Sequence, residues 1–342
     1  MTTPTAPRRA PVLPARYVVR RTGGTLVLLL VLSVAVFALL QLAPGDPART
    51  LLGPRGATPE ALEAVRAKNH LDDPFVTQYL HWIGDAVRLD LGDSLRTGES
   101  VSSAIGSRLG LTAQLVGLGF AVALVLGIPG GIVSGLRARR ATDRTLQGLG
   151  VIALSTPAFA GSLVLIYVFA LMLGWFPAYG PGDGGAGDRL QHLVLPALAL
   201  GVAVTAVLLK LTRTAVVAEL GRDHVVFARA RGVPRATLLR YVLRGTVVPV
   251  VTSAALVLAY VLAGTVMVEE VFALPGLGQL LVSSITFRDL PLVQAEALLV
   301  AGTVCLVTLL TDLLLPLLDA RLRVPATTTR RRTAPLGTEA AA

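Results

Sequence analysis

The sequence has few charged side chains for its length. Only 15% of its 342 residues are Asp, Glu, Lys or Arg, whereas 53% are hydrophobic. In an ordinary soluble domain roughly a quarter of the residues are charged. The hydrophobic residues also stand in long uninterrupted blocks, and a block of about 20 such residues can cross a bilayer as a helix. The composition therefore excludes an ordinary soluble domain and predicts an all-α, polytopic membrane protein.

Lysine and cysteine are also scarce. Neither of the two lysines, Lys68 and Lys210, follows a glycine, so the chain contains no Gly-Lys-Ser/Thr phosphate-binding loop. If ATP drives this protein, another chain must bind the nucleotide. The single cysteine, Cys305, lies in an apolar run, which predicts a small buried side chain and excludes a disulfide within the chain.

Sequence motifs for catalysis are missing as well. There is no His-Glu-x-x-His, Cys-x-x-Cys or Gly-x-Ser-x-Gly pattern, and the four histidines are scattered along the chain. We therefore predict no enzymatic activity, no metal site and no cofactor. The net charge of +10 does not indicate nucleic-acid binding, because the basic residues cluster beside the apolar blocks, as they do in membrane proteins.

The apolar blocks predict six transmembrane helices. A cytoplasmic N-terminal segment, residues 1–21, precedes a first span over residues 22–45, which no small-x-small cleavage site follows. Residues 46–108 are polar and form an insertion with two short helices, one after Thr58-Pro59 and one after Asp73-Pro74. The five remaining spans occupy a core over residues 109–320, and the tail at 321–342 is expected to be disordered.

The distribution of basic residues predicts the orientation. Of the 31 lysines and arginines, 22 lie in the N-terminal segment, the 137–144 loop, the 210–244 loop and the tail. The 174–192 and 271–291 loops hold one each, and acidic residues outnumber basic ones in the insertion. Because basic loops remain on the cytoplasmic side, we expect both termini in the cytoplasm and the insertion outside.

The segment 210–249 lies between two of the apolar blocks and carries eight basic residues. Gly232 is suited to a helix end that needs a positive φ, and Pro234 to the first turn of a following helix. We predict a helix, an elbow and a second helix here, exposed to water between two spans.

Four motifs in the expected order resemble ABC-importer permeases of the dipeptide, oligopeptide and nickel branch. The segment 210–249 is similar to the coupling loop of that family, although Tyr241 and Gly245 replace its usual His and Asn. The four motifs are Ala228-Arg229-Ala230-Arg231-Gly232 with Pro249, Leu42-Ala43-Pro44-Gly45-Asp46-Pro47, Gly92-Asp93-Ser94, and Val271-Phe272-Ala273-Leu274-Pro275-Gly276-Leu277-Gly278.

The resemblance implies a permease subunit of a binding-protein-dependent importer in the cell membrane, carrying peptides, nickel or other small solutes. It also implies a second homologous permease, two ABC ATPase subunits and an extracytoplasmic binding protein as partners, and no nucleic acid. In this family the coupling loop contacts an ATPase, so the expected coupling residues are Ala228, Arg229, Ala230, Arg231 and Gly232.

Four polar residues near predicted span ends are candidates for the translocation path. Glu269 and Glu270 end the fifth span, and Ser155 and Thr156 precede Pro157 at a predicted kink in the third. Each has a simpler interpretation, as a hydrated helix end or as a local kink. The alternative function is a secondary transporter or channel that works alone, which would need charged sites at mid-membrane.

Overall fold

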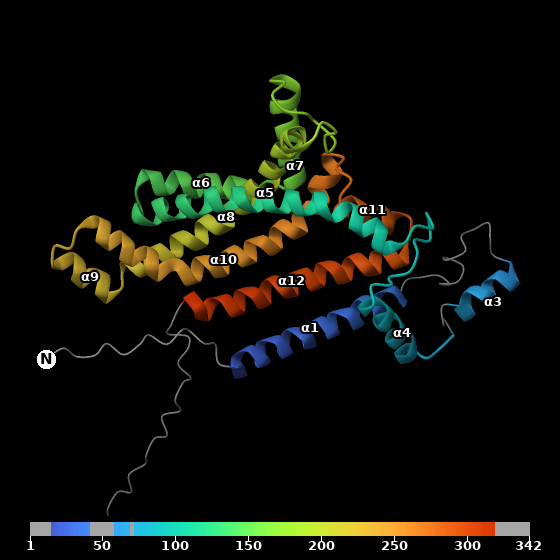
Figure 1. Ribbon diagram of the computed structural model, residues 1–342. Coiled ribbons are helices and arrows are strands. Elements are labelled where there is room, and N and C mark those ends of the chain that lie inside the picture. Colours follow the sequence, from blue (N-terminus) through green and yellow to red (C-terminus); the bar gives the residue numbers. More distant parts are fainter. Residues whose placement is uncertain (1–14, 42–57, 69–71, 319–342) are drawn as a thin grey trace, which may run out of the picture.

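The computed structural model describes residues 15–41, 58–68 and 72–318, and regular structure in these ranges is helical apart from one isolated bridge between Asp93 and Ser100. The long helices run along a common axis (Figure 1). Five described helices are long and apolar enough to cross a membrane, and a bent helix pair adds a sixth candidate if the pair is counted as one span. The prediction of an all-α polytopic protein is confirmed, and the six predicted spans agree with the five or six candidates. The five are α1 (Ala15–Gln41), α5 (Val101–Leu136), α8 (Ala186–Leu220), α10 (Arg235–Val271) and α12 (Leu290–Leu318).

The two ends of this bundle differ. One end, which we call the α9 end, carries α9 (Asp223–Ala230) and the turn between α5 and α6 (Ala141–Ser155). The other, which we call the α11 end, carries α11 (Leu277–Thr286), α4 (Phe75–Val87) and α3 (Pro59–Lys68). The two short helices predicted in the 46–108 insertion are both present, and they begin at Pro59 and at Phe75.

Other boundaries differ from the sequence prediction. Helix α1 already begins at Ala15, inside the predicted N-terminal segment, and its expected end near residue 45 lies outside the described residues, as does the tail. Helix α5 is one continuous helix that begins at Val101, within the predicted 46–108 insertion, and runs to Leu136. Helix α8 does not end with the uncharged run at Leu209 but continues through Lys210 to Leu220. Its apolar face still packs on α5 in this last part.

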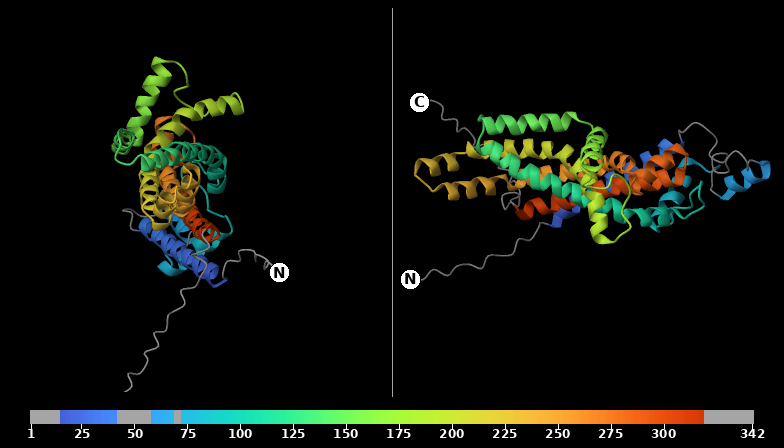
Figure 2. Two further views of the ribbon diagram at one scale, coloured as in Figure 1. Left: turned by 90° about the vertical axis from the view of Figure 1, so that its left-hand side faces the viewer. Right: turned by 90° about the horizontal axis from the view of Figure 1, so that it is seen from above.

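The third span is broken at the predicted kink. Helix α6 ends at Ser155, and the chain then turns by 102° into α7 (Ala158–Leu165) and the π-helical turn η1 (Ile166–Met172). Pro157 cannot donate a backbone hydrogen bond, and it disfavours a helical conformation for the residue before it. The segment containing α7 consequently projects from the bundle (Figures 1 and 2).

The core of the bundle is the contact between α5 and α8, which run in parallel. Small residues recur every four positions along α5, and these residues are Gly119, Ala123, Gly127, Gly131 and Gly135. A Cβ on Gly127 would come within 3.0 Å of Leu208, and one on Gly131 within 2.5 Å of Thr212. This spacing puts the five residues on one face, where small side chains let two helix backbones approach closely.

Helix α1 lies at the edge of the bundle and packs on α12 and α4. Arg21 Nη1 lies 3.1 Å from Asp312 Oδ2, and the Tyr17 hydroxyl donates to the Asp312 carbonyl at 2.8 Å. At the α11 end an aromatic cluster joins α1 to α4, and its members are Phe37, Phe75, Tyr79 and Trp82. Elsewhere in α12 Cys305 is buried, as predicted.

Replacing Gly131 with alanine tests the contact between α5 and α8. The added methyl group would collide with Thr212 and the Leu209 carbonyl oxygen, so the helices must separate. Overpacking of this kind costs about 1–3 kcal/mol, and we expect a lower melting temperature in mild detergent. The matched control is Gly110→Ala, also in α5, where a Cβ meets nothing within 4 Å; this variant should melt at or above the wild-type temperature. Equal melting of Gly131→Ala and wild type would contradict the packing argument.

Candidate functional site

The predicted elbow is a helix end with defined geometry. Gly232 has a φ of +75°. Its N–H donates to the Arg229 carbonyl at 3.0 Å, and the next N–H, from Val233, donates to the Ala228 carbonyl at 3.1 Å. This pair of bonds is a Schellman motif, in which the residue with positive φ is usually glycine. The prediction for Gly232 is confirmed, and Pro234 immediately precedes the first residue of α10.

One side of α9 is anchored to the bundle. Val225 is fully buried between Val216 of α8 and Val242 of α10. Glu219, near the end of α8, is also buried; Arg222 Nε lies 3.1 Å from one of its carboxylate oxygens and His224 Nε2 lies 3.3 Å from the other. These contacts fix the position of α9 between the two spans. Because α8 runs to Leu220 and α10 begins at Arg235, the segment outside the long helices is shorter than the predicted loop of 210–249.

Gly245 of α10 explains one departure from the family pattern. The Glu219 carboxylate packs directly against its backbone, and any Cβ at this position would overlap the carboxylate. A side chain in this position therefore cannot coexist with the buried Glu219. Tyr241, the other departure, is exposed on the same helix.

The opposite side of α9 is exposed and mixes apolar with basic residues. Phe227 is 66% exposed and Val226 51% exposed. Arg229, Ala230 and Arg231 are exposed beside them, whereas Ala228 is half-buried. The structure thus places the five predicted coupling residues together at the tip of the molecule (Figure 1). The sequence analysis did not single out Phe227, although two large apolar residues directly before a basic motif are a signal that could have identified it.

A second polar cluster braces the same end. The Asp143 carboxylate, which is buried, accepts from Arg213 Nε at 2.6 Å and from Arg213 Nη2 at 2.8 Å. It also accepts from the Ser134 hydroxyl at 2.6 Å and the Arg139 backbone N–H at 2.7 Å. A bidentate arginine–carboxylate pair is strong and directional. The pair of Arg213 and Asp143 therefore fixes the turn between α5 and α6 to α8.

The four candidate path residues do not form one site. Ser155 and Thr156 lie exposed at the break between α6 and α7, and the Thr156 hydroxyl donates to the Ile152 carbonyl at 2.9 Å. Glu270 is exposed near the end of α10. Its neighbour Glu269 is fully buried. Within the described residues, no hydrogen bond or ion pair connects the Ser155–Thr156 break to the glutamates.

Glu269 caps the start of α11. One carboxyl oxygen accepts from the Thr112 hydroxyl at 2.7 Å, and the other from the Gly278 and Gln279 backbone N–H groups at 2.7 and 3.3 Å. Thr112 in turn accepts from the Leu277 N–H at 2.9 Å. First-turn N–H groups of a helix have no partner within it, so this carboxyl group ties α5, α10 and α11 together.

No group of three or more potential metal ligands occurs among residues 15–41, 58–68 and 72–318. The arrangement at the α9 end instead suits the docking of another protein, because it offers a firmly held helix with an apolar and basic exposed side. These features define a polytopic helical membrane protein with an exposed apolar and basic surface at one end of its bundle.

Comparisons with known proteins identify the family. Residues 127–324, more than half of the chain, match the family described as binding-protein-dependent transport system inner membrane component, and residues 14–116 match its N-terminal companion. The chain belongs to this family and is a permease subunit of an ABC importer, as the motifs predicted. ATP hydrolysis therefore belongs to partner subunits, in agreement with the missing phosphate loop.

Two relatives align over nearly their whole length. A peptide permease protein of Brucella ovis is 37% identical over 316 residues, covering 90% of this chain and 99% of that protein. The glutathione transport system permease protein of Escherichia coli K12 is 38% identical over 308 residues, covering 90% and 98%. Among solved structures, the inward-facing MetNI methionine ABC transporter matches with a TM-score of 0.50 and 17% identity, over 63% of this chain and 96% of that one.

Replacing Glu269 with alanine tests its role as a cap. The change leaves the Thr112 hydroxyl and two backbone N–H groups without their acceptor in a buried place, at a cost of about 1–3 kcal/mol for each unsatisfied group. We expect a clearly lower melting temperature in mild detergent. Glu270→Ala removes the exposed neighbour and should melt like the wild type. If both variants melted alike, the carboxyl group of Glu269 would not be holding the three helices together.

Proposed function

We propose that the α9 end faces the cytoplasm and docks an ABC ATPase subunit through Ala228, Arg229, Ala230, Arg231 and Gly232 together with Phe227. The observation that carries this proposal is the two-sided character of α9. Its inner side is fixed by Val225 and by the contacts of Glu219, and its outer side exposes Phe227 beside two arginines. A partner that moves this helix would therefore also move the ends of α8 and α10.

A simpler role for the basic residues is to anchor the topology. Anchoring requires positive charge near the span ends, but it does not require an exposed phenylalanine at the tip of a separately packed helix. Adjacent exposed apolar side chains, here Val226 and Phe227, are suited to a binding surface. The arginines can pair with acidic groups of the partner, where each charge-assisted bond contributes about 1–3 kcal/mol when partly buried.

The orientation can be tested by cysteine labelling in a Cys305→Ser background. A cysteine at Ala230, at the α9 end, should react with a membrane-impermeant maleimide only after the membrane is opened. A cysteine at Glu63, in α3, should react in intact cells. The reverse pattern would place the α9 end outside and would exclude contact with a cytoplasmic ATPase.

Phe227→Ala tests the docking surface. Removing an exposed aromatic side chain leaves the fold intact but removes an anchor of the interface, and such anchors contribute about 2 kcal/mol or more to binding. We expect at least about tenfold weaker capture of the ATPase subunits by the purified permease, and correspondingly less transport. The same losses are expected for Ala228→Glu and Gly232→Val, with normal amounts of permease in the membrane.

The matched control is Phe287→Ala. Phe287 is 55% exposed at the opposite, α11 end of the bundle, so its loss should not change ATPase capture. Equal capture by wild type, Phe227→Ala and Ala228→Glu would show that this surface does not dock the ATPase. Loss of these variants from the membrane would assign the segment to folding instead.

We further propose that the complete transporter contains a second homologous permease, two ATPases and an extracytoplasmic binding protein, and that it lies in the cell membrane. The family name, with its binding-protein-dependent system and inner membrane component, supports this assembly. Ser155, Thr156 and Glu270 remain candidates for the translocation path. Glu269 was proposed with them, but its complete set of hydrogen bonds favours a structural role.

Peptides are the substrate class that we propose. The names of two relatives, a peptide permease and a glutathione permease, support peptides over nickel. Uptake of radiolabelled di- and tripeptides by vesicles containing the complete transporter and its binding protein is the direct test. ATP-dependent accumulation is the expected result; accumulation of nickel without any peptide would overturn the assignment.

A further inference from the structure

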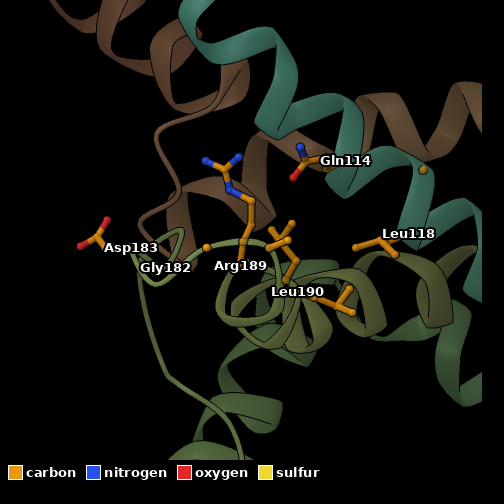
Figure 3. Close-up of a pocket in the computed structure, with 10 residues that line it drawn as sticks. Gln114, Leu118, Gly182, Asp183, Arg189 and Leu190 are labelled. Carbon is orange, nitrogen blue, oxygen red and sulfur yellow. The ribbon is translucent and has the colours of Figure 1, made fainter.

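A cavity of about 910 Å³ opens beside the first turns of α8, towards the α11 end. It lies between α5, the start of α8 and the loop before it (Figure 3). Most of its wall is apolar or glycine. Its polar side chains are Gln114 of α5, Arg189 of α8 and Asp183 of the loop, beside apolar walls formed by Leu118, Leu190 and Leu193.

Arg189 brings an unneutralised positive charge to this cavity. Asp183 points away from the guanidinium group (Figure 3). Asp188, next in the sequence, is engaged elsewhere: its carboxylate accepts from the Gly184 N–H at 2.9 Å and lies 3.5 Å from His192 Nδ1. In the part of the chain that the structure describes, no carboxylate lies within ion-pair distance of Arg189. The cavity therefore offers a cation that lacks an anion.

Gln114 places a hydrogen-bonding amide deeper in the same cavity. It is the only amide or charged side chain between Leu109 and Leu136, and it is exposed on α5. Gly119 of α5 faces Leu200 of α8. Because the two helices run in parallel, Gln114, five residues earlier, lies opposite about Leu195. That position is six residues, or about 9 Å, further along α8 than Arg189. Polar side chains at such depth in a span face water or protein rather than lipid, so this wall borders a hydrated space.

We propose that Arg189 and Gln114 bind the carboxylate group of a peptide substrate as it enters the permease. Two N–H groups of a guanidinium match the two oxygens of a carboxylate, and the Gln114 amide can donate from the deeper side. The leucines and glycines of the wall accept side chains of varied size, which suits a transporter of many peptides. This inference rests on the proposed peptide transport.

A phospholipid phosphate is the competing anion for Arg189. Headgroups remain at the membrane interface, where a single arginine can reach them. The Gln114 amide, about 9 Å deeper along the span, is out of reach of a headgroup that stays at the interface and contributes nothing to such a contact. The pairing of Arg189 with Gln114 in one cavity therefore favours a solute with a carboxylate, and the lipid becomes an outcome of the test.

The test uses the assembled permease–ATPase complex in nanodiscs without its binding protein, so that only sites of the membrane complex are measured. Equilibrium binding of radiolabelled trialanine and of its C-terminal amide is compared at up to millimolar concentration. We expect wild type to bind the acid at least about tenfold more tightly than the amide, as a lost charge-assisted contact predicts. Arg189→Ala should abolish this preference, Gln114→Leu should reduce it, and Arg189→Lys should retain part of it.

Arg88→Ala is the matched control. Arg88 is an exposed arginine that follows α4 at the same end of the bundle, outside the cavity, and its guanidinium lies 3.8 Å from Asp85. This variant should keep the full preference for the acid. Equal binding of both peptides to wild type, no binding of either, or an undiminished preference in Arg189→Ala would overturn the proposal.

Two further readouts separate the alternatives. Loss of co-purifying anionic phospholipid from Arg189→Ala, with the peptide preference unchanged, would assign Arg189 to the lipid headgroup. Peptide uptake by the complete wild-type transporter tests the proposed function separately. If uptake occurs while the preference persists in Arg189→Ala, only the carboxylate site fails; if no peptide is taken up, the proposed function itself fails.

Discussion

The close approach of α5 to α8 is the contact on which the other features of this permease depend. A lipid bilayer provides no hydrophobic force that would drive two apolar helices together, so their association depends on how closely their surfaces fit. A face of four glycines and one alanine lets Leu200, Leu208, Thr212 and Val216 lie directly on the α5 backbone. The pair then forms the surface against which α6, α7 and α10 pack.

Buried carboxyl groups hold the ends of the bundle. Asp143 joins the α5–α6 turn to α8 at one end, and Glu269 joins α5 and α10 to α11 at the other. Asp289, buried beside the start of α12, accepts from the Ser94 hydroxyl at 2.5 Å and from the Leu95 N–H at 3.2 Å. In each case the carboxyl oxygens serve backbone N–H groups at a helix start or a turn. Glu219 is the counterpart at α9, where the partners are Arg222 and His224.

Local signals in the sequence predicted much of this fold. The charge-free runs predicted the spans, Thr58-Pro59 and Asp73-Pro74 predicted the two short helices, and Gly232 predicted the turn after α9. These features could be predicted because each of them depends only on residues that are neighbours in the sequence. The position of the break at Pro157 was also predicted. Its angle of 102° was not, since it depends on how α7 packs against α8 and α10.

The polar contacts could not be predicted because their partners lie far apart in the chain. Thr112 and Glu269 are 157 residues apart, and Asp143 and Arg213 are 70 apart. From the sequence alone, Glu269 resembles Glu270, its neighbour at the same span end. Only the fold shows that one is a buried cap and the other is exposed.

The glycine face of α5 also constrains how the length of this chain can change. Each residue turns a helix by about 100°. Deleting one residue between Gly119 and Gly131 would therefore rotate the remaining small residues away from α8 and present bulkier neighbours in their place. Insertions and deletions in this part of α5 would have to preserve the helical phase, whereas the loops between helices have no such phase to keep. The contact between α5 and α8 thus constrains how many residues this part of α5 contains, as well as which residues they are.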